Sequence, residues 1–157
     1  YLLTNKTRLA KIADMIKDIS KTGNTLVVFD RIACGKMLVD LIDGATFISG
    51  TNKSKERVAE YERINNEHNA IVLASSGIVS TGINIPRIFN LVIIEPGKSY
   101  IKVLQTVGRG VRKAADKDHV EVWDLTSSMK YSKRHLTKRK AFYKLKEFPH
   151  KVTKIQL

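Results

Sequence analysis

The stretch Leu26-Val27-Val28-Phe29, followed by Asp30, decides the fold. Four consecutive apolar residues are typical of a strand covered on both faces, as in a parallel sheet, because a strand with one face in water alternates apolar and polar residues. Two similar runs follow at 70–74 and 91–94, and a further strand is expected at 120–125. The sequence therefore predicts a central parallel sheet.

Helix patterns alternate with these strands. Residues 5–21 carry apolar side chains at helical spacing, and Gly23 is a natural stop after them. Further elements are expected as helices at 33–42, from Ser54 as cap to about Ile64, and at 99–107, and as a short strand at 46–48. The Ser/Gly-rich segment Ser75–Pro86 is expected to be a loop. Strands and helices that alternate through short connections indicate an α/β fold with a doubly wound parallel sheet.

The net charge of +13 is concentrated in one part of the sequence. Residues 128–157 hold ten Lys or Arg and a single acid, Glu147, a net charge of +9, whereas residues 1–127 carry +4. We divide the chain into a sheet domain, 1–126, and a basic extension, 127–157, with a weakly amphipathic helix expected at 132–148. So dense a basic block indicates a polyanion or an anionic surface as partner, and the alternative is a solvated tail.

Several classes of protein and site are not expected. No apolar run approaches the roughly 20 residues that span a bilayer, and no signal peptide is recognisable. The single cysteine, Cys34, is expected to be a buried apolar residue of a helix. The histidines lack metal-ligand spacing, so no metal site is expected at His68, His119, His135 or His150. A first residue of Tyr1 instead of Met suggests a fragment or a processed product.

Ligands of open parallel sheets bind at loops that leave the carboxyl ends of the strands. The first such segment is Asp30-Arg31. The second is Ser75–Pro86, whose hydroxyls could bind backbone phosphates or, alternatively, bond their own backbone as turn residues do.

The third segment is Gln105–Lys113. Arg109 and Arg112 are three apart, so on a helical turn they share a face, and two planar guanidinium groups suit a phosphate. The alternative is that both form surface salt bridges. A dinucleotide-binding motif is rejected, because Lys113 stands where a third glycine is needed and no strand precedes Gly108.

In their order and spacing these segments resemble the C-terminal RecA-like domain of superfamily 2 helicases over residues 24–126. The sequence Gln105-x-x-Gly108-Arg109-x-x-Arg112 resembles motif VI, and Ser76–Pro86, with Thr81-Gly82-Ile83-Asn84-Ile85-Pro86, resembles motif V. Leu26–Asp30 resembles motif IV, and Gly50 followed by Arg57 resembles the motif between IV and V.

This resemblance implies roles for matching residues. Arg112 is the implied arginine finger at the γ-phosphate of ATP, with Arg109 assisting and Gln105 coupling the nucleotide site to the domain interface. The residues implied to bind the nucleotide are Gly82, Asn84 and Gly108, although many relatives have Asp in place of Asn84. The residues expected to contact nucleic acid are Arg31, Gly50, Thr51, Ser75, Ser76 and Thr81. Many relatives have Thr in place of Ser76, a change that keeps the hydroxyl.

In the extension, the charge favours phosphate contacts without base reading by Lys138, Arg139, Lys140, Lys144 and Lys146. Phe142 and Tyr143 could stack on bases, or alternatively pack on the sheet domain.

The sequence shows neither a Gly-x-x-x-x-Gly-Lys-Ser/Thr loop nor an Asp-Glu pair after a buried strand. ATP and Mg²⁺ are therefore expected to be bound mainly by an N-terminal RecA-like domain of the same chain, and the 157 residues alone are expected to be inactive as an ATP hydrolase.

The implied protein is a cytoplasmic, ATP-dependent helicase or translocase that remodels branched DNA by branch migration, fork regression or unwinding, in replication, recombination and repair. RNA–DNA hybrids are a further possible partner. One alternative is a non-catalytic nucleic-acid-binding module that uses the basic extension. Another, docking to a membrane or protein, lacks the broad apolar face of an interfacial helix.

Overall fold

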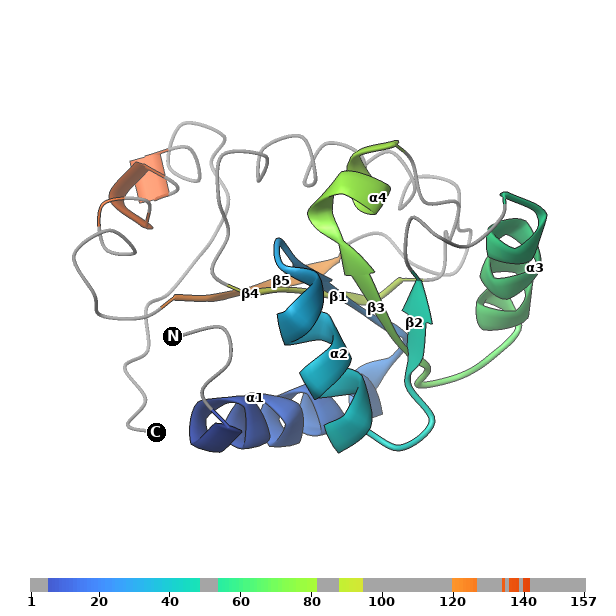
Figure 1. Ribbon diagram of the computed structural model, residues 1–157, viewed down its shortest axis with the longest axis horizontal. Coiled ribbons are helices and arrows are strands. Elements are labelled where there is room, and N and C mark those ends of the chain that lie inside the picture. Colours follow the sequence, from blue (N-terminus) through green and yellow to red (C-terminus); the bar gives the residue numbers. More distant parts are fainter. Residues whose placement is uncertain are drawn as a thin grey trace.

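The computed structural model describes residues 6–48, 54–81, 88–94, 120–126, 134, 136–138, 140 and 141, without the side chains of Ser54, Ser80 and Thr81. Figure 1 shows the elements, which run in the order α1 (Lys6–Ile19), the 3-10 turn η1 (Ser20–Thr22), β1 (Thr25–Phe29), α2 (Ile32–Leu41), β2 (Thr46–Ile48), α3 (Ser54–Asn65), β3 (Ile71–Ser75), α4 (Ser76–Thr81), β4 (Asn90–Ile94) and β5 (Glu121–Leu125).

The strands form one parallel sheet in the order β2-β3-β1-β4-β5, which confirms the predicted fold class. All five residues of β1 are buried. Because successive side chains of a strand point to opposite faces, Leu26 and Val28 enter one core while Val27 and Phe29 enter the other. A strand with helices on both faces needs apolar residues at every position, which explains the run at 26–29.

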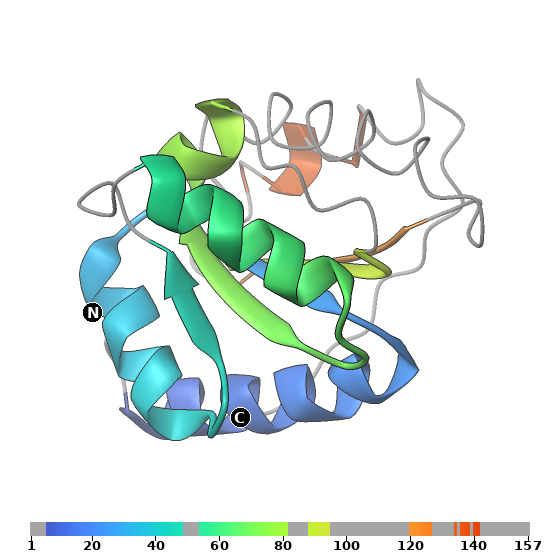
Figure 2. The same cartoon turned by 90° about the vertical axis from the view of Figure 1, so that its right-hand side faces the viewer.

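Helices cover both faces of this sheet. The core on one face contains apolar residues of α1 and α2, including Leu9 and Leu38, and the core on the other face contains residues of α3 and α4, including Ile64 and Val79. Figures 1 and 2 together show α2 and α3 on opposite sides of β2 and β3. The described part of the chain is therefore a three-layer α/β/α domain.

The chain changes direction within the sheet, and this change positions the candidate site. From β1 it passes beyond β3 to β2, and it then returns through β3 to β4 on the other side of β1. Connections between parallel strands keep one handedness, so this reversal places α2 and α4 on opposite faces. The carboxyl ends of the neighbouring strands β1 and β3 therefore lead to opposite sides of the sheet, which makes them a topological switch point.

Buried amides close the opposite, amino edge. The Asn24 side chain donates hydrogen bonds to the carbonyls of Ile64 and Glu67, both at 3.1 Å, and accepts one from the Ala70 N–H at 2.8 Å. Asn90 donates to the Thr22 hydroxyl at 2.9 Å and to the Ile19 carbonyl at 3.2 Å. These bonds fix the ends of α1 and α3 against the sheet, because buried polar groups are costly to leave unpaired.

One expected element is wrong in part. Ser75 ends β3 and residues 76–81 form α4, whereas a loop was expected over Ser75–Pro86. Ile78 and Val79 are buried against the sheet, and this packing outweighs the weak helix propensity of Ser and Gly. Residues 82–87 and the expected helix at 99–107 lie outside the described residues. Within the expected helix at 132–148, the described residues are helical.

Gly35 lets α2 approach β1 closely. A Cβ atom added at this position would lie 2.2 Å from Cζ of the buried Phe29 ring. The ring also stacks on Phe47 with 5.7 Å between centroids, so it has little room to move.

We predict that Gly35→Ala lowers the free energy of unfolding by about 1–3 kcal/mol, the usual effect of an added methyl in a full core. Urea denaturation measures it. Gly77→Ala is the matched control, because a Cβ there would meet only Ser75 Oγ at 4.0 Å, and it should cost no stability. Equal stabilities of the two variants would contradict the close approach of α2.

Candidate functional site

The switch point brings together two of the segments that the sequence singled out. Phe29 and Ser75 are register partners at the ends of β1 and β3. The next residues, Asp30 and Ser76, consequently lie side by side, and the Ser76 hydroxyl donates a hydrogen bond of 2.6 Å to Asp30 Oδ1. Asp30 is exposed and Ser76 is partly buried. Sequence reasoning placed both residues at this edge but missed their contact, because the register of β1 against β3 was not known.

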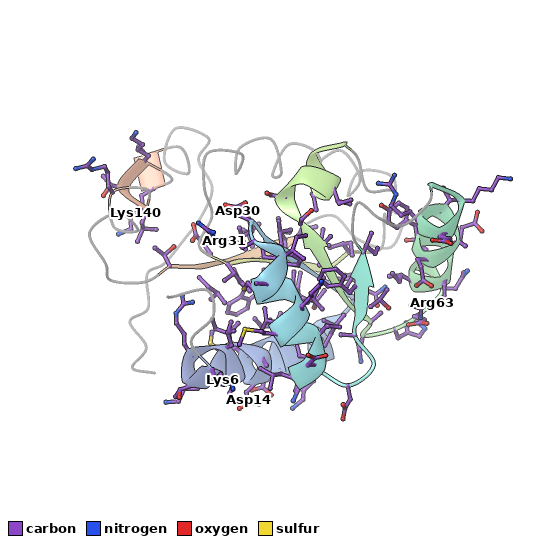
Figure 3. All side chains as sticks on the ribbon, viewed as in Figure 1. Lys6, Asp14, Asp30, Arg31, Arg63 and Lys140 are labelled. Carbon is purple, nitrogen blue, oxygen red and sulfur yellow. The ribbon has the colours of Figure 1, made fainter. Side chains whose placement is uncertain are left out.

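Arg31 follows Asp30 and is the N-cap residue of α2. Its backbone is extended, with φ −106° and ψ 127°, and its carbonyl accepts the N–H groups of Cys34 at 3.1 Å and Gly35 at 3.4 Å. Its side chain is exposed, and Figure 3 shows it with Asp30 at the end of β1. The turn thus presents one negative and one positive side chain to solvent at the switch point.

The other hydroxyls of the second segment differ in their surroundings. Ser75 Oγ accepts the Ile78 N–H at 3.4 Å, which is the local turn bonding that was the alternative to phosphate binding. Thr81 ends α4, and its side chain lies outside the described residues. Among the described hydroxyls of this segment, that of Ser76 thus donates a hydrogen bond to a residue at the end of another strand.

Two of the predicted basic contacts lie in the described part of the extension. Lys138 is exposed and Lys140 is partly buried, and both are helical. Figures 1 and 2 show the helical residues of 134–141 on the side of the sheet where α4 follows β3, and Figure 3 labels Lys140 there. Positive charge thus lies on the same side of the sheet as the switch point.

The remaining predicted site residues lie outside the described ranges and stay predictions: Gly50, Thr51, Gly82, Asn84, Gln105, Gly108, Arg109, Arg112, Arg139, Lys144 and Lys146. Arg57 is described, in α3. Burial raises the pKa of the Tyr61 phenol one turn later, and the positive charge of Arg57 partly offsets this rise in pKa.

Other kinds of site receive no support from the described residues. They contain no group of three or more His, Cys, Asp or Glu side chains that could hold a metal ion. Cys34 is buried in α2, as predicted, and His68 is exposed. Among the described helices, none is both long enough and apolar enough to cross a membrane.

Comparison with known sequences gives a family. Residues 7–114 match the family described as helicase conserved C-terminal domain. The ATP-dependent DNA helicase uvsW of Enterobacteria phage T4 is 33% identical over 153 residues, which cover 94% of this chain and 30% of that protein. A putative ATP-dependent RNA helicase of Methanocaldococcus jannaschii is 27% identical over 152 residues, which cover 88% of this chain and 19% of that protein. The chain thus spans less than a third of the length of these relatives.

Solved structures agree with this assignment. The crystal structure of T4 UvsW superposes with a TM-score of 0.71 at 26% identity, over 91% of this chain and 33% of that one. The C-terminal part of the Fun30 ATPase domain has a TM-score of 0.67 at 13% identity, over 81% of this chain and 43% of that one, which shows a shared fold. The chain belongs to the helicase conserved C-terminal domain family and is a RecA-like C-terminal domain of a superfamily 2 helicase.

Proposed function

We propose that this chain is the C-terminal motor domain of an ATP-dependent DNA helicase or translocase that remodels branched DNA. The observation that carries the proposal is the switch point, where segments resembling motifs IV and V meet through the hydrogen bond between Ser76 and Asp30. Open α/β sheets bind their ligands at such points. The identity to a DNA helicase, 33%, against 27% to a putative RNA helicase, favours DNA as the track.

We assign the nucleic-acid contact to the carboxyl edge of the sheet. Ser76 and Arg31 offer an O–H and a guanidinium to backbone phosphates, and such contacts position a protein on its track without reading sequence. The basic extension, whose described helical residues lie on the same side of the sheet, adds charge that favours any sequence equally. The proposed role of these residues is therefore to hold the strand while the two RecA-like domains move.

We assign the response to ATP to the segment Gln105–Arg112. Arg112 is the proposed arginine finger, with Arg109 beside it, because guanidinium groups stabilise the charge that develops on a transferring phosphoryl group. ATP and Mg²⁺ supply that reacting phosphate and its charge neutralisation, and they are held mainly by an N-terminal RecA-like domain. The support for this assignment is the spacing of motif VI and the family membership. We place the protein in the cytoplasm.

We predict that Arg112→Ala lowers ATP turnover by about 10³-fold or more in the protein that contains both RecA-like domains. A coupled ATPase assay at saturating DNA measures it. Lys11→Ala, which removes an exposed positive charge from α1, is the control and should keep full turnover. Turnover of Arg112→Ala close to that of the unaltered protein would contradict the finger assignment.

A second candidate function, a non-catalytic nucleic-acid-binding module, is favoured by the +9 charge of residues 128–157. We expect the full chain to bind DNA more tightly than residues 1–127, and its affinity to fall more steeply with salt. The slope of log K against log salt concentration should differ between the two by roughly 0.7–0.9 for each phosphate contact that the extension makes. Fluorescence anisotropy at several salt concentrations measures both quantities. If the truncation changes neither, the extension is not a contact surface.

A further inference from the structure

We propose that Asp30 competes with the nucleic-acid backbone for the hydrogen bond that the Ser76 hydroxyl donates, and so keeps the phosphate contact weak and releasable. This inference rests on the proposed function, which assigns Ser76 to a phosphate. It concerns Asp30, the acid beside the contact, for which the motif resemblance implies no role.

Ser76 has a single proton to donate. A serine hydroxyl has one proton, whereas an ionised phosphodiester and an ionised carboxylate only accept hydrogen bonds. Ser76 donates its proton to Asp30 Oδ1 at 2.6 Å, a separation typical of charge-assisted O–H···O⁻ bonds. A phosphate can therefore take a hydrogen bond from Ser76 only if the hydroxyl turns away from Asp30.

The exposure of Asp30 allows the Ser76 hydroxyl to turn from Asp30 to a phosphate. Asp30 is exposed, so water can replace the lost hydrogen bond to its carboxylate, while Ser76 is held in place at the start of α4. The hydroxyl needs only to rotate, and no covalent bond forms or breaks. The register pairing of Phe29 with Ser75 keeps the two groups adjacent in either state.

The charges at this turn have opposite effects on a phosphate. Arg31 attracts it, whereas Asp30 both repels it and retains the proton that would bind it (Figure 3). A motor must release its track in every step, and a contact with a competitor beside it is released more easily than one without. Asp30 is accordingly expected to lower affinity, although it belongs to a nucleic-acid-binding edge.

The test uses the 157-residue chain and a fluorescein-labelled single-stranded DNA oligonucleotide in a low-salt anisotropy titration. We expect Asp30→Ala, which removes both the charge and the acceptor oxygens, to tighten binding about two- to fivefold, the size of one exposed charge interaction, and Ser76→Ala to weaken it by a similar factor. In the double variant Asp30→Ala/Ser76→Ala, the gain from the first change should largely disappear. Asp43→Ala removes the same charge from the exposed turn before β2, at the opposite edge of the sheet, and sets the general effect of net charge.

The outcomes distinguish the assignment of Ser76 to a phosphate from the inference about Asp30. If Ser76→Ala binds as the unaltered chain does, the assignment of Ser76 to a phosphate is wrong, and the inference about Asp30 is overturned with it. If Ser76→Ala weakens binding but Asp30→Ala behaves like Asp43→Ala, the contact stands and the inference alone is overturned. An equal gain from Asp30→Ala with and without Ser76 would show plain repulsion and would also overturn the competition. Thermal unfolding of each variant checks that the fold is retained.

Discussion

The parallel pairing of β1 with both β3 and β4 is the constraint on which the rest of the structure depends. It buries every residue of β1 and divides the apolar side chains between two cores, each closed by its own helices. It also brings the ends of β1 and β3 together, so that residues 46 positions apart share a hydrogen bond. Without this register, Asp30 and Ser76 would not be neighbours.

The fold followed from the sequence because its signals are local. An uninterrupted run such as 26–29 predicts a strand buried on both faces, and its alternation with helical periodicity predicts a parallel sheet. The helix at 76–81 was missed because Ser-Ser-Gly has poor helix propensity, and only the burial of Ile78 and Val79 against the sheet explains it. Strand order was not predicted either, since it depends on contacts between segments distant in sequence.

The sequence predicts residues for the candidate site but not the geometry among them. The glycines, hydroxyls and arginines of the motifs identify chemistry suited to phosphate, and their order indicates the family. The contact between Asp30 and Ser76 can be predicted only when the register of β1 against β3 is known. The close approach of α2 to Phe29, which the missing Cβ of Gly35 allows, can be predicted only from the packing of the helix on the sheet. A carboxylate beside a hydroxyl that is proposed to bind phosphate also runs against the simple expectation that such edges are basic.

The central claim is that nucleic acid binds at the carboxyl edge of the sheet, around the switch point. Hydrogen exchange of the chain with and without single-stranded DNA, resolved by mass spectrometry into peptides, tests it most directly. We expect DNA to slow exchange in peptides spanning 30–35 and 75–81, and to leave exchange unchanged in peptides at the amino edge, such as 42–46 and 65–70. Protection confined to the amino edge, or to the basic extension alone, would contradict it.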